Sequence, residues 1–301
     1  MISLPIVFHP LYDLKMSQAS RFPIQKYSQL KKKLEIDGIL KKRNLFVPLP
    51  LSLSIISRTH DPLYVNRVHS CSLSEMEKRK IGLPEIDRFC ERAFVSAGGT
   101  LLAAKLALNF GFAANVAGGS HHAARSGGSG FCIFNDVAIA VNYLLESGKV
   151  KNVIILDLDV HQGDGTATIF EMDPRVVTVS IHCEKNFPVR KAKSDLDIDL
   201  KKGVTDTEYL YFLENTLKKI NTVPADLVVY NAGVDIHEND SLGYLKVSSS
   251  GIVLREEKVV EFCRSRGVPL VITLGGGYQK SIANLVALHS IIFKVMVNCW
   301  E

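Results

Sequence analysis

The sequence lacks most of the features that mark specialised protein classes. Its 301 residues include only six cysteines, which are scattered and form no C-x-x-C pair. This excludes a disulfide-stapled miniprotein and a cysteine-based zinc site, and it predicts reduced thiols in a cytoplasmic compartment. Glycine (21) and proline (11) are too scarce for a collagen-like or low-complexity chain. With 47% apolar and 22% charged residues, the composition is that of a globular protein and not of a disordered one.

Long uninterrupted apolar runs are also missing. The two longest apolar stretches are 45–56, which two prolines break, and 282–300, which a histidine and a lysine interrupt. Neither offers about 20 consecutive apolar residues, so we expect no transmembrane segment. The first 14 residues lack the basic region and the following apolar region of a signal peptide.

Acidic residues are scarce in one segment. Residues 21–43 hold eight basic and two acidic residues, a surplus of +6 in a chain of net charge +5, so the rest of the chain carries −1. The simplest interpretation is a solvated helix face, and the alternative is a docking face for an acidic partner or an anionic membrane surface. Since the segments with candidate chemistry lie outside 21–43, we expect no direct nucleic-acid binding.

Short apolar runs alternate with helix-like stretches along the whole chain. The runs are continuous in their apolarity, as in strands that are covered on both faces of a parallel sheet. This alternation predicts a single α/β domain over residues 1–301, with a doubly wound, mainly parallel sheet flanked by helices. The predicted strands are 5–8, 113–117, 153–158, 176–181, 227–231 and 269–274, and the predicted helices are 22–40, 99–110, 135–146, 206–220 and 251–266.

Four segments with candidate chemistry each follow a predicted strand. They read GGSHH at 118–122, DLDVH at 157–161, NAGVD at 231–235 and GGGY at 275–278. In sheets of this type, functional residues gather at the carboxyl ends of the strands. We therefore expect the four segments to form one site.

Two of these segments offer metal ligands. Asp157, Asp159 and His161 alternate, so in an extended chain they point to the same side. Neighbouring carboxylates are costly to bury unless a cation compensates them. Asp159, His161 and Asp235 would supply three ligands to a catalytic metal and leave a position open for water. The ligand set suits zinc and also iron(II). The alternative is that an aspartate at a strand end caps the next helix.

The other two segments offer acid–base and hydrogen-bonding groups. One of the tandem residues His121 and His122 can act as a general base and the other as a proton donor. Each ring needs a carboxylate to orient it, and Asp157 and Asp164 are nearby. The glycines before Tyr278 match no nucleotide-binding motif. They allow the backbone to carry a phenol into a crowded site, where its hydroxyl can stabilise an oxyanion.

Together the segments resemble the histone deacetylase family, the zinc-dependent acyl-lysine hydrolases of the arginase–deacetylase superfamily. GFCIFND at 130–136, DLDVHQGDG at 157–165 and YNAGVD at 230–235 follow the family's order and spacing. Gln162 stands where class I enzymes usually carry a second histidine, so the chain is similar to class IV and bacterial relatives.

The resemblance implies a role for each of these side chains. It implies the zinc ligands Asp159, His161 and Asp235, the catalytic pair His121 and His122, their partners Asp157 and Asp164, and the carbonyl-polarising Tyr278. It also implies an acyl-lysine tunnel at Gly130, Phe131 and Phe187, and a structural potassium ion near Asp157, Asp159, His161 and Ser180. Ser120 departs from the bulky aromatic residue that commonly precedes the histidine pair, which leaves the acyl length open.

The expected reaction is hydrolysis of an N-acyl-lysine side chain of a protein substrate. The same chemistry would serve a hydrolase of acylpolyamines or other small amides, or a long-chain fatty deacylase. A non-catalytic acyl-lysine-binding scaffold is disfavoured, because neither a metal ligand nor the tyrosine is missing.

Overall fold

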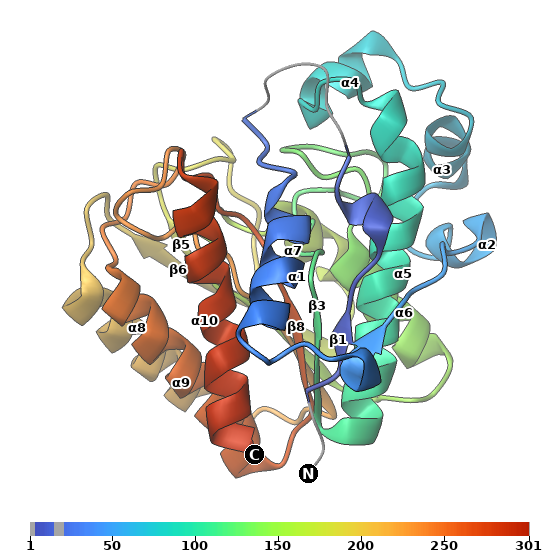
Figure 1. The fold of residues 1–301 in the computed structure, drawn as a ribbon. Coiled ribbons are helices and arrows are strands. Elements are labelled where there is room, and N and C mark those ends of the chain that lie inside the picture. The colour runs from blue at the N-terminus through green and yellow to red at the C-terminus, as the bar shows by residue number, and fades with distance from the viewer. Residues whose placement is uncertain (1–3, 15–20, 301) are drawn as a thin grey trace.

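One sheet of eight parallel strands runs through the protein in the computed structural model, which describes residues 4–14 and 21–300 (Figure 1). The strand order is β2-β1-β3-β8-β7-β4-β5-β6. All neighbouring strands are parallel, so the chain crosses over between them, mostly through helices. This confirms the predicted α/β fold with a doubly wound sheet. The strands are β1 (Ile6–Val7), β2 (Leu45–Phe46), β3 (Phe112–Asn115), β4 (Val153–Asp157), β5 (Val176–Cys183), β6 (Leu196–Leu200), β7 (Leu227–Asn231) and β8 (Leu270–Thr273).

Helices cover both faces of the sheet. Successive residues of a strand point to opposite faces, so Ile154 and Leu156 of β4 join one apolar cluster while Val153 and Ile155 join the other. The helices are α1 (Lys26–Ile36), α2 (Leu53–Ile56), α3 (Pro62–His69), α4 (Glu75–Ile81), α5 (Asp87–Phe110), α6 (Asp136–Glu146), α7 (Asp164–Phe170), α8 (Asp206–Ile220), α9 (Ser249–Arg266) and α10 (Ile282–Trp300).

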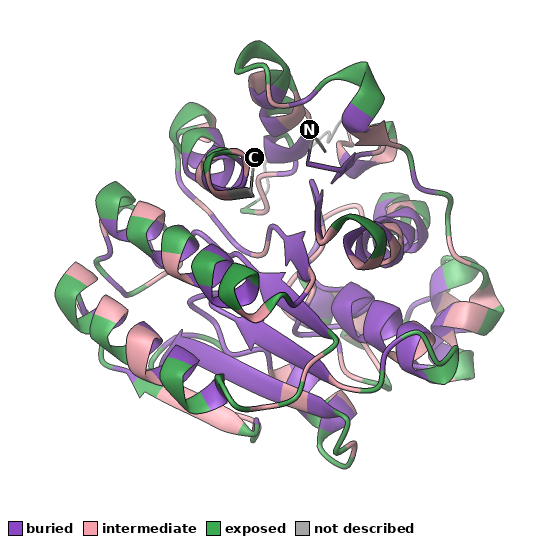
Figure 2. Cartoon of the chain, turned by 90° about the horizontal axis from the view of Figure 1, so that it is seen from below, coloured by how far each residue is buried: buried purple, intermediate pink, exposed green. Residues whose placement is uncertain are grey.

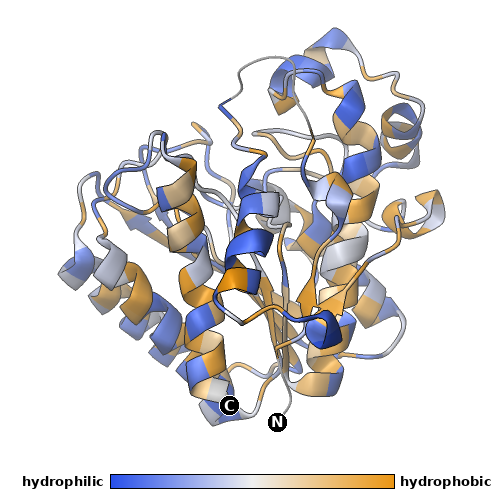
Figure 3. Ribbon diagram, viewed as in Figure 1, coloured by the Kyte–Doolittle hydropathy of each residue, from blue (hydrophilic) through white to orange (hydrophobic). Residues whose placement is uncertain are grey.

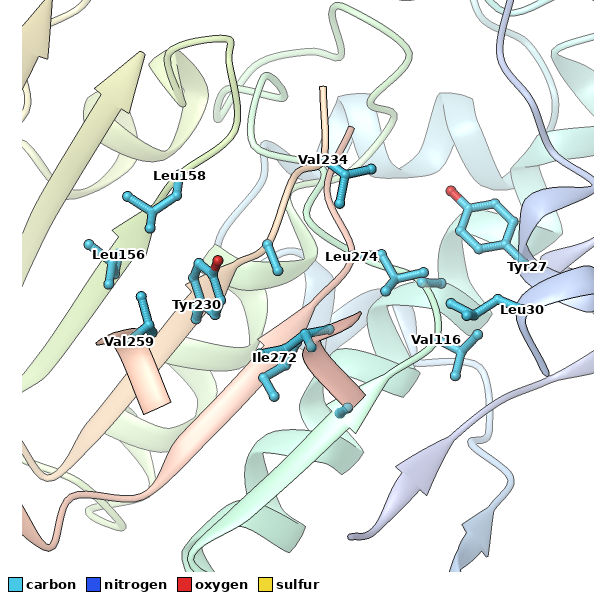
Figure 4. Packing of buried hydrophobic residues seen from close by; sticks show 14 of the residues in the cluster. Tyr27, Leu30, Val116, Leu156, Leu158, Tyr230, Val234, Val259, Ile272 and Leu274 are labelled. Carbon is cyan, nitrogen blue, oxygen red and sulfur yellow. The ribbon is translucent and has the colours of Figure 1, made fainter. Parts of the chain in front are cut away.

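Each face of the sheet has its own helical layer. Helices α1, α8, α9 and α10 supply the first cluster, where Leu30 of α1 and Val259 of α9 lie on the side of Leu156 and Ile272 (Figure 4). Helix α6 and the second half of α5 supply the second cluster. The central strands are therefore buried throughout (Figure 2), which explains their continuous apolar runs.

All six predicted strands form, but two further strands escaped the sequence pattern. β6 lies at the edge of the sheet and reads Leu-Asp-Ile-Asp-Leu, and its first four residues are partly or fully exposed. Such alternation is expected of a strand that faces water on one side, whereas the predicted strands have continuous apolar runs. β2 has only two residues, too few for any pattern.

Two helices differ in extent from the prediction. The helix expected over 22–40 spans only Lys26–Ile36. The helix expected over 99–110 begins at Asp87, so the Gly98-Gly99 pair lies in the middle of α5. Two glycines in a helix interior lower its intrinsic stability, and here tertiary packing outweighs that cost.

Helices α5 and α10 are long and apolar enough to cross a membrane by length and composition alone. Their most apolar windows have mean hydropathies of 1.4 and 1.6, and 67% and 50% of those windows are buried inside the fold. Figure 3 shows apolar residues both on the strands and on the helices that cover them. Packing in the core accounts for their apolarity, and the absence of a transmembrane segment stays a prediction.

The glycines of α5 allow the segment before α2 to pack directly on this helix. A Cβ atom added to Gly98 would lie 2.0 Å from the carbonyl oxygen of Leu49, a backbone atom that cannot turn aside. We expect Gly98→Ala to lower the free energy of unfolding by about 1–3 kcal/mol, as overpacking does elsewhere. Chemical denaturation measures the change.

Gly127→Ala is the matched control, because nothing lies within 4 Å of a Cβ atom there and its backbone is not left-handed. Equal stability of the two variants would show that the close approach to Leu49 is unimportant.

Candidate active site

The four segments with candidate chemistry follow β3, β8, β7 and β4, four strands that lie next to one another in the sheet. Because the strands are parallel and in register, with Asp157 opposite Asn231 and Asn231 opposite Thr273, their carboxyl ends meet at one edge. This confirms that segments more than 100 residues apart in the chain share one place in the fold.

The three predicted metal ligands lie together. Potential ligand atoms of Asp159, His161 and Asp235 are all within 4.8 Å of one another, and all three residues are buried. His161 Nδ1 lies 3.0 Å from Asp159 Oδ1 and 3.1 Å from Asp235 Oδ2. The other carboxylate oxygens accept backbone hydrogen bonds, Asp159 Oδ2 from Gly276 N at 2.6 Å and Asp235 Oδ1 from Val160 N at 2.8 Å. The carboxylates are thus held in fixed orientations.

The electrostatics of this cluster fit a divalent cation. Burial and the adjacent Asp159 carboxylate together raise the pKa of Asp235 to about 7, although His161 opposes this. Burial lowers the pKa of His161, but the two carboxylates outweigh it and raise this pKa to about 10. Without a bound metal, the positive charge of the His161 imidazolium therefore compensates the negative charge of the Asp159 and Asp235 carboxylates. A divalent ion would balance them with a neutral imidazole, which is the donor set expected of zinc.

The tandem histidines are oriented by the expected carboxylates. His121 Nδ1 lies 2.6 Å from Asp157 Oδ2, and His122 Nδ1 lies 2.6 Å from Asp164 Oδ1. The two Nε2 atoms face each other at 3.1 Å. Asn231 Nδ2 donates to the second oxygen of Asp157 at 3.0 Å, which holds that carboxylate in place.

The two rings have opposite charge preferences. Burial lowers the pKa of His121, but the carboxylates of Asp157 and Asp159 outweigh burial and raise it to about 9. Burial and the neighbouring charge of His121 lower the pKa of His122 to about 4, although Asp164 opposes this. At neutral pH the pair therefore carries one positive charge, on His121.

The glycine-rich loop after β8 brings Tyr278 to the same cavity. A Cβ atom on Gly276 would lie 2.0 Å from Asp235 Oδ2, so only glycine allows this loop to pass the predicted metal ligands. The Tyr278 ring centre lies 6.2 Å from that of His161. Burial and the carboxylates of Asp159 and Asp235 raise the pKa of Tyr278 well above its usual value. Its hydroxyl therefore remains a hydrogen-bond donor.

The predicted tunnel residues lie around this site. The Phe131 ring centre is 5.9 Å from that of Tyr278, and Phe187 meets the His122 ring at 4.8 Å and 88°. A Cβ atom on Gly130 would lie 2.6 Å from His122, so glycine permits the close approach. Phe131 has a left-handed backbone (φ +67°), which is uncommon for an aromatic residue. That conformation holds its ring beside Tyr278.

Gln162 and Ser180 lie close to the site but outside the groups described so far. The Gln162 side chain bonds both backbone groups of Ala192, donating to its oxygen at 3.0 Å and accepting from its nitrogen at 2.8 Å. It therefore ties the loop that carries Phe187 to the metal-ligand segment. Ser180 lies opposite Asp157 in the β4–β5 register, where the potassium ion implied by the resemblance stays a prediction.

Sequence reasoning missed Lys26, which it counted with the solvated basic residues. Lys26 is 1% exposed, its Nζ donates to Gly275 O at 3.0 Å, and it lies 5.9 Å from the Tyr278 ring centre. Burial lowers its pKa to about 8, against the opposing effect of three nearby aspartates. Its spacing of four and eight residues from the buried Leu30 and Leu34 was the available signal.

The rest of the basic segment is partly neutralised. Lys31 pairs with Glu35 at 2.8 Å and Lys33 pairs with Asp37 at 3.1 Å, both on α1 or its end. Docking of an acidic partner on this face stays a prediction.

A second buried cation, Arg255 of α9, was also missed. Its Nη1 donates to Gly233 O at 2.6 Å and lies 3.4 Å from Leu158 O. Gly233 stands two residues before Asp235 and Leu158 one residue before Asp159, both predicted metal ligands. Glu256 balances its charge, at 2.5 Å from Nη2. Arg255 therefore braces the two loops that carry the carboxylate ligands.

Comparisons with known proteins agree with this geometry. The model of the histone deacetylase domain matches residues 20–292. An uncharacterized protein from Picosynechococcus sp. is 42% identical over 97% of this chain and 98% of its own length. Histone deacetylase 2 of Arabidopsis thaliana is 32% identical over 94% of this chain and 76% of its own length.

A crystal structure of an HDAC homologue from Aquifex aeolicus shares the fold, with a TM-score of 0.81 at 21% identity over 98% of this chain and 84% of that one. The extent of the family match, together with the level of identity to the Arabidopsis enzyme, leads to one conclusion: the chain belongs to the histone deacetylase family of hydrolases.

Proposed function

We propose that this protein is a zinc-dependent hydrolase of N-acyl-lysine side chains. The observation that carries the proposal is the convergence on one cavity of Asp159, the two oriented histidines and Tyr278. Asp159, His161 and Asp235 would hold the zinc ion. Bound there, zinc would polarise the amide carbonyl and lower the pKa of a water molecule toward about 7.

The protein's own residues would carry the protons. Neutral His122, oriented by Asp164, accepts a proton from the attacking water at Nε2. The Tyr278 hydroxyl donates a hydrogen bond to the oxyanion that develops on the substrate carbonyl. Protonated His121 supplies the positive charge beside His122, and the pair returns a proton to the leaving amine. The C–N bond breaks, and the products are a carboxylate and the lysine amine.

Chelation tests the metal. We expect removal of zinc to abolish hydrolysis of an acetyl-lysine peptide and re-addition to restore it. His161→Ala should lower bound zinc and reduce activity by at least about 100-fold, because one of three ligands is lost. Metal analysis and the peptide assay measure both effects, and an acetylpolyamine assayed in parallel tests the small-molecule alternative.

His69→Ala, at an exposed position on α3, is the control and should change neither quantity. Full activity of the chelated protein would contradict the proposal.

Tyr278→Phe tests the oxyanion donor. We expect kcat to fall by about 10²–10³-fold, the usual cost of losing one such donor, with zinc content and thermal unfolding unchanged. Tyr211→Phe, at a residue 62% exposed on α8, should leave kcat unaltered. A Tyr278→Phe enzyme within a few-fold of the wild type would show that the phenol is not the donor.

Lys26 is proposed as a positioning residue for the loop that carries Tyr278, because it holds the carbonyl of Gly275. Lys26→Met should lower kcat about 10–100-fold, as is usual for residues that orient a site, with KM and zinc content nearly unchanged. Lys26→Arg should recover part of the loss, since it restores a cationic donor. Equal kcat values for the two variants would contradict this role.

A further inference from the structure

Two adjoining cavities lie at the catalytic histidines. His121, His122 and Tyr278 line the first, and Asp136 lies in the wall of the second. Four residues line both cavities: Arg92, Ser96, Ser120 and Phe131. The short side chain of Ser120, directly before the histidine pair, thus stands where the two cavities meet.

Arg92 places a positive charge at this junction. It projects from α5, and its Nε donates to the carbonyl of Tyr12 at 2.9 Å. Its guanidinium carbon lies 4.8, 5.7 and 5.9 Å from the ring centres of Tyr27, Phe22 and Phe89. Within residues 4–14 and 21–300, no carboxylate lies within 4.0 Å of its guanidinium nitrogens. Aromatic faces stabilise a guanidinium but do not neutralise it.

Among the described residues that line the second cavity, the one carboxylate already has hydrogen-bond partners. Asp136 accepts hydrogen bonds from the backbone nitrogens of Gly119 at 3.2 Å and Ser120 at 2.8 Å, and from the Thr100 hydroxyl. Burial raises the pKa of Asp136, which reduces the fraction in its charged form. Arg92 therefore keeps a positive charge that no described carboxylate pairs with.

The size of the cavities limits what the ligand can be. Their volumes are about 30 and 20 Å³. A single water molecule needs about 10–15 Å³, so the two cavities together match roughly three to five water molecules and suit a short acyl group. A long fatty chain exceeds this space.

We propose that the acyl pocket recognises short acyl groups that end in a carboxylate, of which N-succinyl-lysine is the probe. The terminal carboxylate would pair with the guanidinium of Arg92, a geometry that allows two parallel hydrogen bonds. This inference rests on the proposed function. Water adds to the amide carbonyl, the C–N bond breaks, and a dicarboxylate and the lysine amine are released, with no further reactant.

The test compares succinyl-lysine and butyryl-lysine peptides with the zinc-loaded full chain. The two acyl groups each have four carbons and differ in a terminal carboxylate or methyl. We expect kcat/KM for the succinyl peptide to exceed that for the butyryl peptide by at least about 10-fold, as a close charge pair allows. A myristoyl-lysine peptide should be a poorer substrate than either.

Variants of Arg92 test whether this residue causes the preference for the succinyl peptide. Arg92→Met should bring the succinyl-to-butyryl ratio to one or below, whatever its overall activity, and Arg92→Lys should keep part of the preference. Arg88→Met is the control, because Arg88 lies one turn earlier on α5, is 45% exposed and pairs with Glu85. Its ratio should equal that of the wild type.

Inhibition of the wild type gives a second measurement that does not depend on a folded variant. Free succinate should inhibit hydrolysis of an acetyl-lysine peptide more strongly than butyrate does. A wild type that prefers butyryl or myristoyl peptides, or an unchanged ratio in Arg92→Met, would overturn the inference. Zinc-dependent cleavage of the acetyl peptide alone would leave the proposed function standing and refute this extension, whereas no cleavage of any acyl peptide would refute both.

Discussion

Two carboxylates, Asp159 and Asp235, are buried side by side at the carboxyl edge of the sheet, and the rest of the site compensates for their charge. Burying two like charges is unfavourable, so each oxygen is matched by a donor or a cation. Backbone N–H groups hold one oxygen of each, and His161 lies against the other two. Lys26 adds a buried positive charge behind the glycine-rich loop. The same arrangement of charges and donors would suit a divalent ion.

The core strands and the site segments could be predicted because their signals are local. A strand covered on both faces has a continuous apolar run, and the ligands and histidines stand within a few residues of the strand ends. β6 was missed for the opposite reason, since its alternating sequence reflects an exposed edge. The start of α5 was missed because a glycine pair in a sequence does not reveal whether it ends a helix or allows close packing.

The three supporting cations could not be found in the same way. Lys26, Arg92 and Arg255 each come from a helix that is distant in sequence from the residues they serve. A single basic residue on a helix usually faces solvent, and only the packing of α1, α5 and α9 against the sheet turns these three inward. Apart from Glu256, which pairs with Arg255, their partners are backbone carbonyls or aromatic rings. Such partners leave no mark of spacing in the sequence, and only Lys26 had a local signal, its helical spacing from Leu30 and Leu34.

The register between β4 and β7 has a consequence for how this fold can vary. These strands lie side by side, yet β5, β6 and α8 intervene between them in the chain. The length of that excursion does not determine where Asp159 and Asp235 meet, because hydrogen bonds between the strands do. Insertions and deletions in its surface loops are therefore compatible with an intact metal site. One residue added within β4 or β7 would instead turn every following side chain to the opposite face and separate the ligands.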